Sequence, residues 1–173
     1  MLWQLRALVV APPEDETLGE TYQEADAFKA LLGGQDRLLG LDLGTRTIGL
    51  ALSDVSRMIG SALETIRRTK FKADVTRLFE VAEQHRVAGL VLGFPINLDG
   101  SEGPRCQATR AFARNVNRLS GLPILLWDER LTTAAAERML IEADTSRRRR
   151  AEVIDKLAAT IILQGALDRM RER

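Results

Sequence analysis

Three short apolar runs separated by helical spacing constrain the fold of this chain more than any other feature. The runs are Leu38–Leu43, Val87–Leu92 and Leu122–Trp127. Runs of this length are typical of strands buried on both faces of a sheet. Because helical segments connect them, the three strands are expected to be parallel and to share one sheet. The chain is therefore predicted to be an α/β protein.

Two further strands are expected beside the first run. Large and small side chains alternate over residues 48–53, which predicts a strand with one bulky face and one small face. Gly44–Arg46 is short enough for a tight turn, so this strand and Leu38–Leu43 form a hairpin. Residues 58–66 are expected to add a third antiparallel strand. The prediction is a five-stranded mixed sheet, with three antiparallel N-terminal strands followed by parallel strands, flanked by helices.

Apolar residues at i, i+3, i+4 and i+7 predict a helix around residues 75–82. Similar spacing predicts helices around 108–119, over 133–143 and over 150–170. The segment 1–36 is interpreted as an acidic extension, partly helical over Tyr22–Leu32, and the main domain as residues 37–173.

The net charge of +1 conceals a segregation of charge. Residues 11–36 carry seven acidic side chains and one basic, whereas residues 37–173 carry 23 basic and 17 acidic. Of those 23 bases 20 are arginine, whose planar fork matches phosphate oxygens. The excess of positive charge in residues 37–173 indicates a polyanionic partner. The simpler alternative is that these arginines only form a solvated surface and bind no partner.

Composition excludes several classes of site. The single cysteine, Cys106, excludes an internal disulfide and a cysteine-based zinc cluster, and the single histidine, His85, excludes multi-histidine metal sites. No apolar run reaches the ~18 residues that a membrane helix needs. A cytoplasmic protein without a membrane partner is expected.

Carboxylates stand where the predicted strands end and on the last helix. Asp42 lies within the first strand, Asp128 and Glu129 terminate the last strand, and Asp155 borders the apolar face of the last helix. The carboxyl ends of parallel strands share one edge, where α/β sheets bind ligands. Structural alternatives are a turn cap for Asp42, a polar strand end for Asp128 and Glu129, and an arginine-paired helix border for Asp155.

Taken together, these acids predict a metal site. Like charges held close together repel unless cations neutralise them. Oxygen-only ligation without Cys or His favours Mg²⁺ or Mn²⁺. Two such ions suit phosphodiester hydrolysis.

Four blocks of the chain resemble the YqgF (RuvX) family. They are Gly40–Asp54, Gly93–Gly103, Asp128–Thr133 and Ile154–Ala159, they occur in the family's order, and they span about 38–167. The resemblance implies an RNase H-like fold and a nuclease, a hydrolase acting on ester bonds. The family's acidic site falls on Asp42, Glu129 and Asp155, and the adjacent Asp128 is a further candidate metal ligand, so the choice between Asp128 and Glu129 stays open.

The resemblance implies a function in ribosome biogenesis, in processing the 5′ end of pre-16S rRNA, or the resolution of Holliday junctions in four-way DNA. The partner would be structured RNA or branched DNA. Candidate nucleic-acid-binding residues are Arg46, Arg130, Asn97, Ser101 and the run Arg147, Arg148, Arg149 and Arg150. Junction resolution would favour a homodimer with two sites.

Two other classes of function are open from the sequence. One is a noncatalytic nucleic-acid-binding ribosome-assembly factor. The other is phosphate handling on ATP, because Asp42–Thr45 also resembles the first phosphate loop of the sugar kinase and actin superfamily. The two lobes of that superfamily need more than 173 residues.

Overall fold

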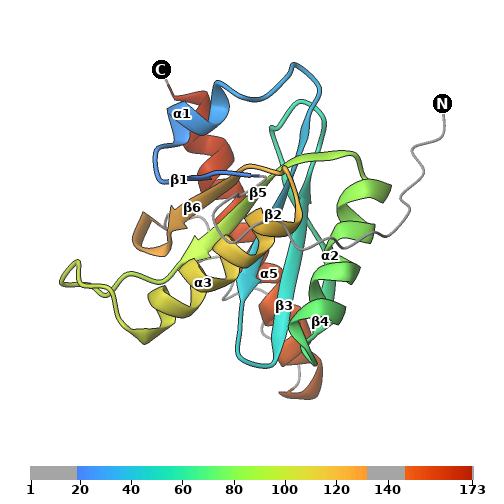
Figure 1. Ribbon diagram of the computed structural model, residues 1–173, viewed down its shortest axis with the longest axis vertical. Helices are drawn as coiled ribbons and strands as arrows, with labels where there is room; N and C mark the ends of the chain where they lie inside the picture. The colour runs from blue at the N-terminus through green and yellow to red at the C-terminus, as the bar shows by residue number, and fades with distance from the viewer. Residues whose placement is uncertain (1–18, 132–146, 173) are drawn as a thin grey trace.

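The computed structural model, which describes residues 19–131 and 147–172, shows a mixed sheet between two layers of helices (Figure 1). The sheet has six strands in the order β1-β6-β5-β2-β3-β4. Their bounds are Thr21–Tyr22 (β1), Arg37–Leu43 (β2), Thr47–Ser53 (β3), Gly60–Arg67 (β4), Val87–Phe94 (β5) and Ile124–Asp128 (β6).

The strand directions confirm the predicted mixed sheet. Strands β2, β3 and β4 are antiparallel neighbours, and β5 and β6 follow parallel to β2. The turn between β2 and β3 is closed by the amide of Gly44, which donates to the carbonyl of Thr47 at 2.9 Å. The edge formed by the carboxyl ends of β2, β5 and β6 therefore exists as expected.

The predicted count of five strands is wrong, because β1 adds a sixth at the edge beside β6. Thr21 and Tyr22 pair in parallel with Ile124 and Leu125. A strand of two residues is too short to show any periodicity, so the sequence pattern could not reveal it. The chain then turns into the short helix α1, Ala25–Lys29.

The described part of the N-terminal segment packs against the body of the protein. Phe28 of α1 is fully buried between the sheet and the last helix, α5, which spans Arg147–Arg171. The predicted helix over Tyr22–Leu32 is thus shortened by the edge strand before it. The domain boundary after residue 36 stays a prediction.

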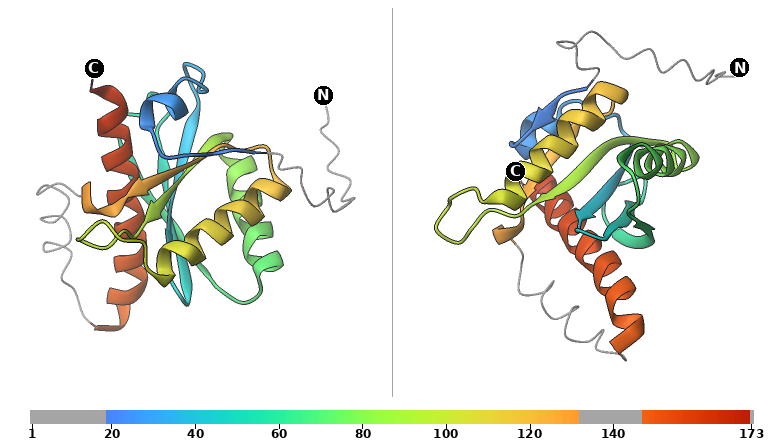
Figure 2. Two further views of the ribbon diagram at one scale, coloured as in Figure 1. Left: turned by 60° about the vertical axis from the view of Figure 1, so that its left-hand side comes forward. Right: turned by 60° about the horizontal axis from the view of Figure 1, so that its bottom comes forward.

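The two faces of the sheet receive different helices (Figure 2). The bulky face packs against α2 (Phe71–Gln84) and α3 (Pro104–Leu119), with Ile48 and Leu50 buried there. The small face packs against α5, with Ala51 buried beneath it. The predicted difference in side-chain size between the two faces of β3 therefore determines that α2 and α3 cover one face and α5 the other.

The helix predicted over 133–143 lies outside the described residues.

Cys106 is buried in α3 and its thiol donates to the carbonyl oxygen of Pro95 at 3.1 Å. In the described ranges no helix combines the length and the apolar character that crossing a membrane requires.

Candidate active site

The acidic residues singled out from the sequence lie on three elements that meet at one edge. Asp42 is the second-last residue of β2, and Glu129 begins a short 3-10 helix, η1 (Glu129–Leu131), directly after β6. Asp155 lies on α5, which crosses the small face of the sheet. Asp42 is partly buried. Its side chain lies on the same face of the sheet as α5, because successive side chains of a strand alternate and those of Leu39 and Leu41 are buried on the opposite face.

Glycines let α5 approach the sheet closely enough for Asp155 to reach this edge. A Cβ atom at Gly49, the residue that pairs with Asp42 in β3, would overlap the backbone carbonyl of Asp155, with the carbonyl carbon at 2.6 Å. A Cβ atom at Gly40 would lie 2.9 Å from the carbonyl oxygen of Ala159. Only glycine tolerates such close backbone contacts.

Thr47 orients the carboxylate of Asp155. Its hydroxyl donates a hydrogen bond to Oδ2 of Asp155 at 2.6 Å, across 108 residues of sequence. Thr47 begins β3 and lies on the same side of that strand as Gly49, so the strand fixes both the approach of α5 and the direction of its acid. Thr47 could not be singled out from the sequence, because nothing in its local pattern shows its distant partner Asp155.

Asp42 is in electrostatic contact with both other acids. Burial raises the pKa of Asp42, and the negative charge of Asp155 raises it further. Burial likewise raises the pKa of Glu129, and there the charge of Asp42 is the next cause. Both shifts reflect carboxylates that are costly to ionise where they lie.

Arg105 is the positive charge that opposes this repulsion. It belongs to the first turn of α3, its side chain is exposed, and it lowers the pKa of both Asp42 and Glu129. Sequence reasoning missed it, because α3 is distant from both acids in the chain. The one signal for Arg105 in the sequence is its place as a basic residue in the first helical turn after the Gly93–Gly103 loop.

Asp128 and Glu129 are adjacent in sequence but differ in their surroundings. The guanidinium of Arg130 donates to both oxygens of Asp128, at 2.7–3.1 Å, and these hydrogen bonds lower the pKa of Asp128. Glu129 instead interacts with Asp42. The structure therefore turns Asp128 toward Arg130 and brings Glu129 to the side of Asp42.

The donor set suits a hard divalent cation. It consists of three carboxylates, and the hydroxyl of Thr47 donates to one of them, that of Asp155. A bound cation would offset the repulsion between the acids, which together with burial raises the pKa of Asp42 and of Glu129. Within residues 19–131 and 147–172, no group of three or more His, Cys, Asp or Glu side chains is placed so that it could hold a metal ion as it stands. Asp42 interacts with Asp155 and with Glu129, and gathering all three around ions would require their side chains to move closer together.

The other predicted residues have varied positions. Arg46 is exposed in the turn between β2 and β3, and Arg130 forms an ion pair with Asp128. Asn97 and Ser101 are exposed and bond to each other, the amide of Asn97 donating to the hydroxyl of Ser101 at 3.0 Å. The backbone of Arg147–Arg150 forms the first turn of α5, and its side chains lie outside the described part.

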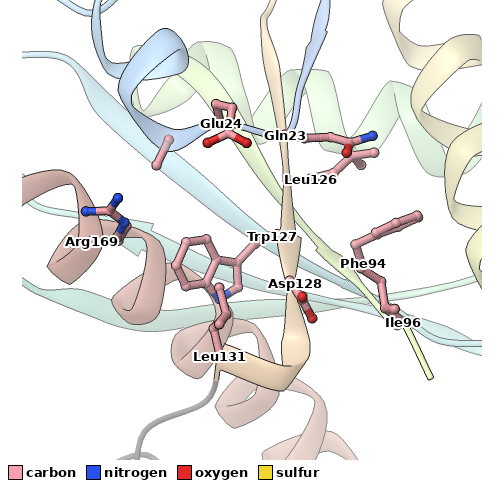
Figure 3. Close-up of a pocket in the computed structure, with 10 residues that line it drawn as sticks. Gln23, Glu24, Phe94, Ile96, Leu126, Trp127, Asp128, Leu131 and Arg169 are labelled. Atoms are coloured by element: carbon pink, nitrogen blue, oxygen red, sulfur yellow. The ribbon is translucent and has the colours of Figure 1, made fainter. Parts of the chain in front are cut away.

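A pocket of about 260 Å³ opens beside Asp128, along the outer edge of β6 (Figure 3). Trp127 and Leu131 line one part of it and Phe94 and Ile96 another. Its lining does not include Asp42, Glu129 or Asp155. The pocket therefore adjoins the acidic edge and is separate from the acids themselves.

The fold is similar to that of a solved structure of RuvC. The structure "T. thermophilus RuvC in complex with Holliday junction substrate" matches with a TM-score of 0.50 and 17% identity, covering 79% of this chain and 96% of that one. Together with the mixed sheet and the acids at its edge, this similarity defines an α/β domain of the RNase H type, as predicted.

Sequence comparison gives the family. The family model described as "RuvX: Holliday junction resolvase" matches residues 36–169. A protein of Roseobacter denitrificans is 61% identical over 83% of this chain and 90% of its own length, and one of Ruegeria pomeroyi is 59% identical over 88% and 97%. Both carry the name "Putative pre-16S rRNA nuclease".

The chain belongs to the RuvX (YqgF) family. The resemblance drawn from the four sequence blocks is thereby confirmed, and with it the prediction of a nuclease, a hydrolase that acts on ester bonds. The roles of individual site residues stay predictions.

Replacing Thr47 by Val tests whether Asp155 needs its hydrogen-bond donor. We expect cleavage and divalent-ion affinity to fall about 10- to 100-fold, as is usual when the partner that orients a ligand is lost. Calorimetric titration with Mn²⁺ measures the affinity. Thr76→Val is the matched control, because the hydroxyl of Thr76 bonds only within α2. Equal effects of the two substitutions would contradict the positioning role.

Proposed function

We propose that this protein is a metal-dependent endonuclease that hydrolyses phosphodiester bonds during processing of the 5′ end of pre-16S rRNA. The observation that carries the proposal is the position of Asp42, half-buried at the sheet edge and in electrostatic contact with both Glu129 and Asp155. Three acids from distant parts of the sequence thus lie on elements that meet at this edge, although burial and mutual repulsion make two of them costly to ionise. The names of the closely similar relatives supply the substrate.

Asp42, Glu129 and Asp155 would hold the ions, with Asp42 shared between them. Mg²⁺ or Mn²⁺, two ions in all, would activate the attacking water and stabilise the leaving oxygen. Thr47 keeps Asp155 pointed at the site. Asp128 is held by Arg130 and would act mainly by fixing the direction in which the chain leaves β6.

Arg105 is suited to bind a phosphate of the substrate. Its charge acts on both Asp42 and Glu129, and its side chain is exposed to solvent. A guanidinium can donate two parallel hydrogen bonds to a phosphate. Further contacts along the nucleic-acid backbone would come from Arg46, Arg130 and the run Arg147–Arg150. The loop between β5 and α3 would add contacts to the substrate through Asn97 and Ser101.

Substituting Arg105 by Gln is expected to reduce kcat/KM for cleavage about 100-fold, the lower end of the range for losing an electrostatic donor from a site. Arg118→Gln is the matched control, because Arg118 is exposed in the last turn of the same helix. Steady-state cleavage of a labelled precursor fragment measures both variants. A similar loss in both would mean that Arg105 contributes only general positive charge.

Resolution of Holliday junctions is the second candidate, favoured by the description of the matching family. It would call for a homodimer that presents two sites to a four-way junction.

Cleavage of a 5′ pre-16S rRNA fragment and of a mobile junction should be compared directly, with wild type and Asp155→Asn, in Mg²⁺ or Mn²⁺ and in EDTA.

We expect metal-dependent cleavage of the RNA by wild type and its loss in Asp155→Asn. Cleavage of the junction alone would replace the first function by the second. Metal-independent RNA binding with no cleavage of either substrate would indicate a noncatalytic assembly factor. Both nucleic-acid functions agree with the expected cytoplasmic location and with the positive charge of residues 37–173.

A further inference from the structure

Leu98 is exposed to an unusual degree for a large apolar residue. It retains 95% of its surface, whereas the other exposed large hydrophobic residues of the described ranges retain 36% to 63%. It belongs to the loop between β5 and α3, which protrudes from the body of the molecule (Figures 1 and 2). Leaving a leucine side chain in water forgoes about 1.5–3 kcal/mol of burial.

The loop holds Leu98 outward by bonding to itself. The amide of Asn97 donates to the carbonyl of Ser101 at 3.0 Å, and the amide of Gly100 donates to the carbonyl of Asn97 at 2.9 Å. The side chain of Asp99 accepts from both the amide and the hydroxyl of Ser101, at 2.9 and 2.6 Å. Gly100 has a φ of +84°, which glycine adopts without strain. The tip is therefore preorganised.

The loop rises beside the candidate active site. It begins at Phe94, which pairs with Asp128 across β5 and β6. A Cβ atom at Gly100 would lie 3.7 Å from Nη1 of Arg130, the residue that follows Glu129. Arg110 stacks over the ring of Phe94 at 4.6 Å and forms an ion pair with Glu102 at the far end of the loop. The apolar tip thus has two arginines at its base, each paired with a carboxylate, and arginine is among the residues that contact phosphates of nucleic acids.

We propose that Leu98 is a wedge that inserts between neighbouring nucleobases of paired nucleic acid and unstacks them next to the acidic site. Apolar side chains of this kind open base steps in many nucleic-acid-binding proteins. The pocket beside Phe94 and Ile96 offers space for a displaced base. This inference rests on the proposed nuclease function and extends it by naming paired regions as the substrate that the loop acts on.

The wedge is tested by binding, without cleavage, on a protein in which Asp42 is replaced by Asn. A series of duplexes carries 2-aminopurine at successive positions, since this base brightens when it is unstacked. We expect fluorescence to rise on binding at one or two positions. Leu98→Ser should abolish the rise and weaken duplex binding about 10-fold, the equivalent of 1.4 kcal/mol, while leaving single-strand binding unchanged. Leu98→Met should retain the rise, because methionine is also apolar and long.

Leu31→Ser is the matched control, because Leu31 is also exposed, at 52%, but follows α1 away from the loop. Circular dichroism verifies that each variant is folded. Absence of a rise with every duplex, or an equal rise with Leu98→Ser, overturns the wedge. A wild-type protein that unstacks duplexes but cleaves no substrate would overturn the nuclease function and leave the wedge standing.

Discussion

Replacing Asp42 by Asn is expected to abolish cleavage and at the same time to make the ion-free protein more stable. The charge of Asp42 interacts with that of Asp155 and with that of Glu129, so its loss should reduce cleavage more than about 100-fold, beyond the effect of losing an orienting partner. Because burial and the charge of Asp155 make ionised Asp42 unfavourable, a neutral side chain of the same shape should stabilise the fold by about 0.5–2 kcal/mol.

The pH dependence of this gain has a definite sign. The pKa of Asp42 is raised in the folded state, so the wild-type protein loses stability as pH rises from the unfolded pKa, about 3.9, through the folded one. The advantage of Asp42→Asn should therefore grow over that range and then stay constant. Urea unfolding in EDTA from pH 4 to 8 measures it. Added Mn²⁺ should stabilise wild type more than the variant.

Asp54→Asn is the control with the opposite sign. The carboxylate of Asp54 accepts hydrogen bonds from the amide of Ile59, the hydroxyl of Ser56 and the amide of Met58, and these bonds lower its pKa to about 2. Its contribution to stability is present above the unfolded pKa and is lost as pH falls toward 2. Asp54→Asn should thus lose stability at neutral pH and keep cleavage. Equal stability shifts in the two variants would contradict the electrostatic account of Asp42.

Replacing Gly49 by Ala is expected to remove both stability and activity. Its new methyl group would overlap the backbone carbonyl of Asp155, and a backbone cannot rotate away as a side chain can. Moving α5 to make room should cost about 1–3 kcal/mol, the usual range for an overpacked core. The same movement would carry Asp155 away from Thr47 and Asp42, so we expect cleavage to be lost as well.

Gly34→Ala is the matched control for this substitution. No atom lies within 4 Å of a Cβ at Gly34, and its stability should change by less than about 0.5 kcal/mol. Thermal unfolding and cleavage are compared for both variants. A Gly49→Ala protein with wild-type stability and activity would mean that α5 does not lie against β3 at this position.

The order of strands and helices could be predicted from the sequence because it depends on periodicity. Alternation over residues 48–53 gave one bulky and one small face, and the structure places α2 against the first and α5 against the second. The edge strand Thr21–Tyr22 could not be predicted, because two residues form no pattern. Its pairing with β6 depends on a surface assembled about a hundred residues later in the chain.

The sequence also indicated that Asp42, Asp128 and Glu129 lie at one edge, because the order of the strands brings the ends of β2 and β6 there. That the acids form one site stays a prediction. What only the tertiary structure decided is their surroundings. It turned Asp128 toward Arg130 and Glu129 toward Asp42, and it added Thr47 and Arg105. The physical reason is that periodicity records which face of an element is buried, whereas contacts between side chains depend on how closely two elements approach. Here two glycines under α5 set that approach, and it is visible only in three dimensions.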